Sequence, residues 1–128
     1  MAPIPPQQAR SVARALACTR IVIGTSAVLA PARLVRPWIG RDAALPAATV
    51  LSRCLGARDL AIGLGAVLAM RHDAPVRGWI EAGGMADAAD LVATLMAFPS
   101  LPRTSRWVVA AAAGAAVATA QVVARSID

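Results

Sequence analysis

The stretch between Arg106 and Arg125 contains no charged side chain, and from Trp107 to Ala120 its only polar side chain is that of Thr119. A helix on the surface of a soluble protein needs a polar face, and this stretch offers none. A helix that crosses a bilayer needs about 20 predominantly apolar residues. The sequence therefore predicts a membrane-spanning helix over residues 107–124.

The rest of the chain contains three more apolar segments of similar length, separated by prolines and arginines. Proline stops or starts a helix because it lacks an amide hydrogen and clashes with the preceding turn. Three tryptophans, at positions 38, 79 and 107, fall near the expected ends of the segments, where an amphipathic ring sits at the level of the lipid headgroups. We expect the remaining spans over residues 12–30, 47–70 and 76–98.

The composition agrees with an all-helical membrane chain. Apolar residues make up 58% of the sequence and charged residues only 16%, which is well below the proportion of about 25% in soluble proteins. Aromatic residues account for 3%, so the alternating, aromatic-rich pattern typical of β-strands is almost absent. We expect a single all-α domain over residues 1–128, a four-transmembrane-helix bundle with short loops in the cell membrane. A soluble, alanine-rich four-helix bundle is the alternative.

The charge distribution narrows the expected partners. The net charge of +6 comes from thirteen arginines that stand singly or in twos beside the apolar segments, so we expect no nucleic-acid partner. The expected partner is the lipid bilayer, with other membrane subunits or further copies of the chain as alternatives. We expect no cofactor, no metal and no cleaved signal peptide in Met1–Arg10. Cys18 and Cys54 are expected to be buried free thiols.

Small residues recur at four-residue spacing within three of the segments. Helices in lipid pack through such residues, because these let two backbones approach closely. We therefore expect three contact seams, made of Ala57, Ala61, Gly65 and Ala69; of Ala89, Ala93 and Ala97; and of Ala110, Gly114 and Ala118.

Seven ionisable residues lie inside the expected spans, where an unpaired charge costs about 2.5 to 3.5 kcal/mol at the bilayer centre. A rise of about 1.5 Å per residue places five of them near the midplane, whereas Arg53 and Glu81 fall nearer the interfaces. These five are our candidate site residues: Asp87, Asp90, Arg58, Asp59 and Arg20.

Asp87 and Asp90 are three residues apart and share one helix face, which Gly83 and Thr94 extend. Antiparallel neighbours joined near Asp73 bring Arg58 to the same level, so we expect a bidentate contact from Arg58 to Asp87 or Asp90. Three roles for the cluster stay open. The cluster would serve as a structural ion-pair network, as a proton or ion relay, or as a set of acid and base groups acting on a lipophilic substrate.

The block Arg53-Cys-Leu-Gly-Ala-Arg-Asp-Leu-Ala-Ile-Gly63, followed by Trp79, Gly83, Gly84, Asp87 and Asp90, carries a resemblance. With Arg20, Ile23, Gly24 and Pro31, it resembles a family of small bacterial four-helix membrane proteins of unknown function, often from GC-rich actinobacteria. The resemblance implies a four-helix fold and a membrane location, and it implies no activity.

From the sequence we expect a small multi-pass membrane protein that serves as an accessory or structural component. The alternatives are a membrane-embedded isomerase or cyclase that uses Asp87 or Asp90 on a lipophilic substrate, and a small transporter or proton relay. A cavity that opens onto the face of Asp87 and Asp90 would favour the alternatives over a purely structural cluster.

Overall fold

A computed structural model of the chain describes residues 4–103 and 105–127. The first three residues of the segment in which we expected no signal peptide lie outside this range. All the regular elements of the described residues are helices, as the sequence predicted. They are α1 (Pro6–Leu29), α2 (Pro31–Ile39), the 3₁₀ helix η1 (Gly40–Ala44), α3 (Pro46–Arg71), α4 (Arg77–Met96), the 3₁₀ helix η2 (Phe98–Ser100) and α5 (Ser105–Ala124).

Prolines define where the first three helices begin. Pro6, Pro31 and Pro46 each occupy the first turn of a helix, where the missing amide hydrogen has no partner to lose and the fixed φ angle suits the helix. The first helix therefore starts six residues earlier than residue 12, the predicted start. The other three long helices begin and end within two residues of the predicted spans.

The expectation of short loops is wrong for the connection between α1 and α3, because that connection is itself helical. Pro31 ends α1 and at once starts α2, and η1 completes the link to Pro46. The amphipathic pattern of α2 explains why it folds against the molecule. Val35 is buried, while Arg33 and Arg36 on the other face are exposed.

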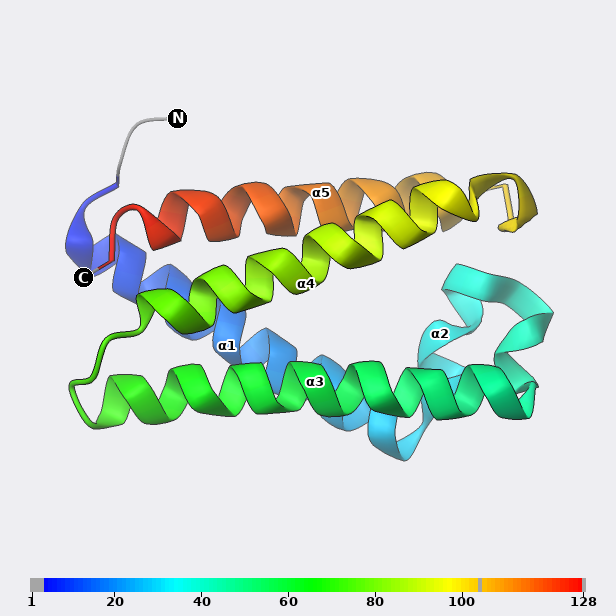
Figure 1. The fold of residues 1–128 in the computed structure, drawn as a ribbon, viewed down its shortest axis with the longest axis horizontal. Coiled ribbons are helices and arrows are strands. Elements are labelled where there is room, and N and C mark those ends of the chain that lie inside the picture. Colours follow the sequence, from blue (N-terminus) through cyan, green and yellow to red (C-terminus); the bar gives the residue numbers. More distant parts are fainter. Residues whose placement is uncertain (1–3, 104, 128) are drawn as a thin grey trace.

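The four long helices form two closely packed pairs, α1 with α3 and α4 with α5 (Figure 1). Contacts between α3 and α4 are less extensive, and α2 and η1 lie across the end of the molecule opposite the two termini. The termini meet at one end, where the backbone N–H of Ile4 donates to Ser126 Oγ at 3.1 Å. The chain thus runs the length of the molecule four times.

The core of this structure is made of small side chains. The buried residues of α1 are Ala9, Ala13, Ala17, Gly24 and Ala27, and those of α3 are Ser52, Gly56, Gly63, Ala66 and Ala69.

The contact seams are real but mostly not those predicted from four-residue spacing. Ala89, Ala93 and Ala97 are all exposed, and a methyl group at Gly114 would meet nothing within 4 Å. On α3 only Ala69 of the predicted row is buried, and the other buried residues of this helix are Ser52, Gly56, Gly63 and Ala66. An alanine-rich helix offers small residues on every face, so their spacing alone does not select the face that packs.

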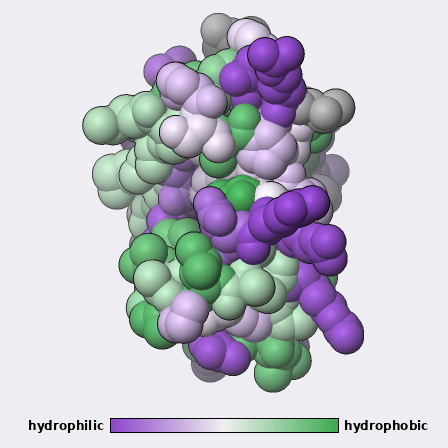
Figure 2. Space-filling view, turned by 90° about the vertical axis from the view of Figure 1, so that its right-hand side faces the viewer, coloured by the Kyte–Doolittle hydropathy of each residue, from purple (hydrophilic) through white to green (hydrophobic). Residues whose placement is uncertain are grey.

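The large apolar side chains lie on the outside of the molecule. Leu29, Met96 and Trp107 are each more than 60% exposed, whereas no leucine, phenylalanine or tryptophan is among the largest fully buried side chains. Hydrophobic and hydrophilic surfaces stand side by side on the end of the molecule that α2 and η1 cover (Figure 2). The expectation that Cys18 and Cys54 are buried is wrong, since both are exposed.

Within the described residues, two helices, α1 and α5, are long and apolar enough to cross a membrane by length and composition, rather than the predicted four. Helices α3 and α4 have 26 and 20 residues but carry several charged side chains each. Core helices of soluble proteins and signal sequences can have the same length and apolarity as α1 and α5. These two helices therefore indicate membrane association only weakly.

Candidate site: an ion-pair network beside a cavity

The five candidate residues come together in one network that links α1, α3 and α4. Arg20 of α1 lies at its centre and donates from Nη1 to Asp59 Oδ1 at 2.9 Å and from Nη2 to Asp87 Oδ2 at 2.6 Å. The same Nη2 also donates to the carbonyl oxygen of Gly83 at 2.8 Å. Arg20 therefore binds two other helices through one guanidinium group.

Arg58 forms the second half of the network. It donates from Nη1 and Nη2 to the two carboxylate oxygens of Asp90, at 3.1 and 2.7 Å, which is the bidentate geometry we expected. Arg58 does not contact Asp87, whose partner is Arg20. Nη2 of Arg58 also lies 3.3 Å from Asp59 Oδ1, so Asp59 joins the two arginines.

Gly83 makes room for the central arginine. A methyl group at this position would lie 2.8 Å from Arg20 Nε, so a larger residue would displace the guanidinium. The side chains of Arg20, Asp59 and Asp87 keep only 13%, 16% and 18% of their exposure. Two guanidinium groups face three carboxylates in this partly buried place, so the network carries one net negative charge.

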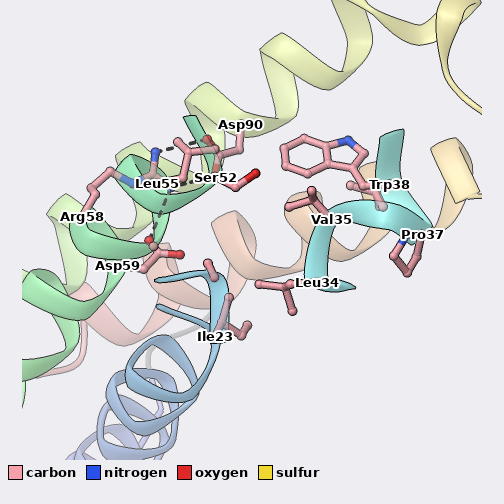
Figure 3. A pocket seen from close by; sticks show the side chains of 13 residues that line it. Ile23, Leu34, Val35, Pro37, Trp38, Ser52, Leu55, Arg58, Asp59 and Asp90 are labelled. Carbon is pink, nitrogen blue, oxygen red and sulfur yellow. Dashed lines mark hydrogen bonds and ion pairs between the residues drawn. The ribbon is translucent and has the colours of Figure 1, made fainter. Parts of the chain in front are cut away.

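A cavity of about 330 Å³ opens beside the Arg58 half of the network (Figure 3). Leu34, Val35, Pro37 and Trp38 of α2 form one wall, and Arg58 stands on the opposite side. The remaining lining residues come from all four long helices and are mostly apolar: Ile23, Ala27, Ser52, Leu55, Gly56, Asp59, Asp90 and Val109.

The Arg20 half of the network is packed rather than hollow. Arg20 and Asp87 border a void of only about 10 Å³ between α1, α3, α4 and α5, too small for a ligand. Asp87 and Asp90, which the sequence placed on one helix face, therefore have different surroundings. Asp87 lies in the packed half, and Asp90 borders the cavity.

Two nitrogen donors that belong to residues of the cavity lining, but are themselves fully buried, lack a hydrogen-bond acceptor among the described residues. They are Nε1 of Trp38 and Nε of Arg58. A buried donor without an acceptor costs about 1 to 3 kcal/mol, so a bound molecule would gain if a small movement of either side chain brought its donor to an acceptor oxygen of that molecule.

The other ionisable residues of the spans lie outside the network. Arg53 donates to the carbonyl oxygen of Val28 at 3.2 Å, and Glu81 accepts from Arg77 at 2.7 Å on the exposed face of α4. His72 is exposed in the turn after α3. In the described part of the chain, no group of three or more His, Cys, Asp and Glu side chains could hold a metal ion.

Sequence reasoning missed the wall formed by α2, since residues 31–46 were treated as a loop. The signal was present: Pro31 at a helix start, with Leu34, Val35 and Trp38 at helical spacing and arginines between them. It also underrated Arg20, because nothing in the spacing of residues indicates that one guanidinium group can reach two neighbouring helices.

Comparison with known proteins adds no relative to this description. The chain matches no protein-family model, no curated protein and no solved structure.

Proposed function

We propose that this chain is a four-span integral membrane protein that binds a lipophilic molecule with a neutral oxygen acceptor in the cavity beside Arg58 and Asp90. The observation that carries the proposal is the cavity itself, because its lining is largely apolar and includes two residues, Trp38 and Arg58, whose buried nitrogen donors lack acceptors. Pockets of this kind, largely apolar with a few placed polar groups, are typical of small-molecule sites.

The distribution of side chains supports a membrane location for all four long helices. In water, folding is driven by burial of large apolar side chains. Here the buried residues are mostly alanine and glycine, and Leu29, Met96 and Trp107 point outward. This is the arrangement expected in lipid, where helices associate through small residues and the solvent around them is hydrocarbon.

The network charges of α3 and α4 are compatible with spanning because each of them is paired with an opposite charge. An unpaired charge at the bilayer centre is expensive, but each aspartate of the network has an arginine within 3.3 Å. Helices of 26 and 20 residues extend over about 39 and 30 Å, enough to cross a hydrocarbon core of about 30 Å. The network then holds the register of three helices, which is the structural one of the three roles that the sequence left open.

The charge balance of the cavity favours a neutral ligand over an anion. Arg58 is already engaged by two carboxylates, and the network has a net negative charge. The groups left to bind are the N–H donors of Trp38 and Arg58, which suit a carbonyl or hydroxyl oxygen. A cavity of about 330 Å³ accepts a molecule of moderate size.

The test uses Trp38 as a fluorescent reporter in protein solubilised in neutral detergent. Trp79→Phe and Trp107→Phe remove the other two tryptophans. A decyl-substituted benzoquinone serves as the probe, since its carbonyl groups accept hydrogen bonds and its ring quenches indole fluorescence. We expect saturable quenching at one equivalent of bound probe.

Leu34→Phe fills part of the cavity and should abolish the saturable phase. Leu68→Phe is the matched control, because Leu68 is exposed on α3 and does not line the cavity. Quenching that rises linearly with probe concentration, and equally in both variants, would contradict the proposal.

A membrane-embedded isomerase or cyclase is the second candidate, favoured by the position of Asp90 on the cavity lining. Both carboxylate oxygens of Asp90 already accept hydrogen bonds from Arg58, which opposes a role for Asp90 in proton transfer to a substrate. Asp90→Asn separates the two functions. An enzyme would retain the bound lipophilic molecule unconverted in the variant, as detected by mass spectrometry of co-purified material, whereas a binding protein would carry the same molecule in both forms.

A further inference from the structure

A second hollow, of about 280 Å³, lies on the opposite face of α2 from the apolar cavity. Three arginines line it: Arg33 and Arg36 of α2 and Arg41 of η1. Its remaining lining is small and uncharged, from Ala32, Gly40, Ala43 and Ala44.

These three arginines have no carboxylate partner among the described residues, since none takes part in any of the five ion pairs. The nearest acid in the sequence, Asp42, lines a different, apolar hollow beside Val35 and Trp38. Arg33 and Arg36 are three residues apart on one helix face, where like charges destabilise a helix. An anion between them would turn this repulsion into attraction.

The chemistry of the hollow favours a phosphate group over a carboxylate. A guanidinium group presents its N–H donors as a planar fork that matches two phosphate oxygens, and a phosphate group has enough oxygens for several such forks. Three arginines around one hollow of this size, with no side-chain acid on its lining, therefore suit a doubly or singly charged phosphate group.

The position of the hollow indicates where such a phosphate could come from. Helix α2 and η1 lie across the end of the molecule opposite the termini (Figure 1). In a four-span arrangement this end lies at the level of the lipid headgroups, where arginines are attracted to anionic phospholipids.

We propose that Arg33, Arg36 and Arg41 form a binding site for a phosphate group, carried by an anionic phospholipid or by a water-soluble phosphorylated molecule. The site is separate from the apolar cavity and does not depend on a ligand there. It would fix α2, whose other face forms a wall of the cavity, against the membrane surface.

The experiment titrates the purified full chain in neutral detergent with dioleoylphosphatidylglycerol, followed by native mass spectrometry, and in a second arm with inorganic phosphate, followed by calorimetry. The test variant combines Arg33→Gln, Arg36→Gln and Arg41→Gln. The control combines Arg10→Gln, Arg71→Gln and Arg125→Gln, which removes the same charge from exposed positions at the other end of the molecule.

We expect the test variant to bind the phospholipid at least about tenfold more weakly and the control to change by less than about twofold. Replacing the three arginines by lysine should give an intermediate loss, because lysine keeps the charge and loses the fork. If inorganic phosphate follows the same ranking and the phospholipid does not bind, the site is assigned to a soluble phosphorylated molecule.

Equal affinity in the wild type and the test variant, or equal losses in test and control variants, would overturn the proposal. The single change Arg41→Gln, outside α2, repeats the test if the triple variant lowers the helical circular dichroism signal. Leu34→Phe separates this proposal from that for the apolar cavity, since it should block the quinone probe and leave phosphate binding unchanged.

Discussion

Arg20 is the residue on which the packing of three helices depends. Its guanidinium group reaches Asp59 of α3 and both Asp87 and the carbonyl oxygen of Gly83 on α4. Because Arg20 and its partners are mostly buried, removing the arginine would leave Asp87 without a counter-charge and Asp59 with only its longer contact to Arg58.

Arg20→Gln should therefore lower the free energy of unfolding in detergent by about 3 to 5 kcal/mol. Arg58→Gln should cost less, about 1.5 to 3 kcal/mol, because Arg58 and Asp90 are nearly one third exposed and water can replace part of the lost bonds. The two variants are compared by thermal or denaturant unfolding. A larger loss for Arg58→Gln would place the centre of the network elsewhere.

Double-mutant cycles test which arginine pairs with which aspartate. We expect coupling of about 0.5 to 3 kcal/mol between Arg20→Gln and Asp87→Asn, and again between Arg58→Gln and Asp90→Asn, because each pair shares a direct bond. Arg58→Gln with Asp87→Asn should couple more weakly than either of these pairs, since the two side chains do not touch and are linked only through Asp59 and Arg20. Strong coupling in that third cycle would contradict the pairing described here.

For individual residues, the sequence predicted the members of the ion-pair network but not all of the bonds between them. Counting residues from the prolines placed five charged residues at one depth, and the structure brings those five together. Whether Arg58 pairs with Asp87 or with Asp90, and which of the two is left to Arg20, depends on how α1 and α3 are rotated about their axes. That rotation is determined by packing between helices, which spacing along one helix does not reveal.

At the scale of elements, α1 and α3 approach so closely that their backbones touch. A methyl group added at Gly24 would lie 2.6 Å from the carbonyl oxygen of Gly56, and one added at Gly63 would lie 2.7 Å from that of Ala17. Such contacts are shorter than any that real side chains make, so the crossing depends on glycine.

Gly24→Ala should push the two helices apart and destabilise the protein by about 1 to 3 kcal/mol. Gly114→Ala on α5 is the matched control, because a methyl group there meets nothing within 4 Å. The control should be neutral or more stable by up to about 1 kcal/mol, since alanine favours the helix. The two melting temperatures give the comparison, and equal shifts would show that α1 and α3 do not cross at Gly24.

The cysteines report on the solvent around α1 and α3. Cys18 and Cys54 are exposed on the helices and lie away from the helix ends. If lipid covers both, a membrane-impermeant maleimide should not label them in intact or permeabilised vesicles, because thiols react as thiolates and these form in water. Both should be labelled after denaturation in detergent. Rapid labelling in native vesicles would place at least one of the helices in water.

The end of α1 and the start of α3 are helix boundaries that sequence reasoning described well, because a proline lies at each. Pro31 and Pro46 limit α1 and α3 in the structure as they did in the prediction. Helix α2 was not predicted, because it is too short to span a membrane and was therefore counted as a loop. Its own residue pattern is nevertheless helical. A search restricted to bilayer-length segments overlooks a short amphipathic helix that closes a cavity.

At the scale of the whole molecule, the proposed function depends on how many helices cross the bilayer. If all four long helices cross, the turn at His72 lies on the same side as the termini, and Ser100 lies on the other side. If only α1 and α5 cross, His72 and Ser100 share a side, and the termini still lie together. The position of His72 therefore separates the two arrangements, whereas the positions of the termini do not.

The most direct measurement places one cysteine at a time in a chain that carries Cys18→Ser and Cys54→Ser. Gln7→Cys, His72→Cys and Ser100→Cys are each labelled with a membrane-impermeant maleimide in right-side-out and in inverted vesicles; all three native positions are exposed. We predict that His72→Cys is labelled in the same vesicles as Gln7→Cys and that Ser100→Cys is labelled in the opposite ones. Labelling of His72→Cys together with Ser100→Cys, or of all three in both preparations, would contradict the four-span arrangement.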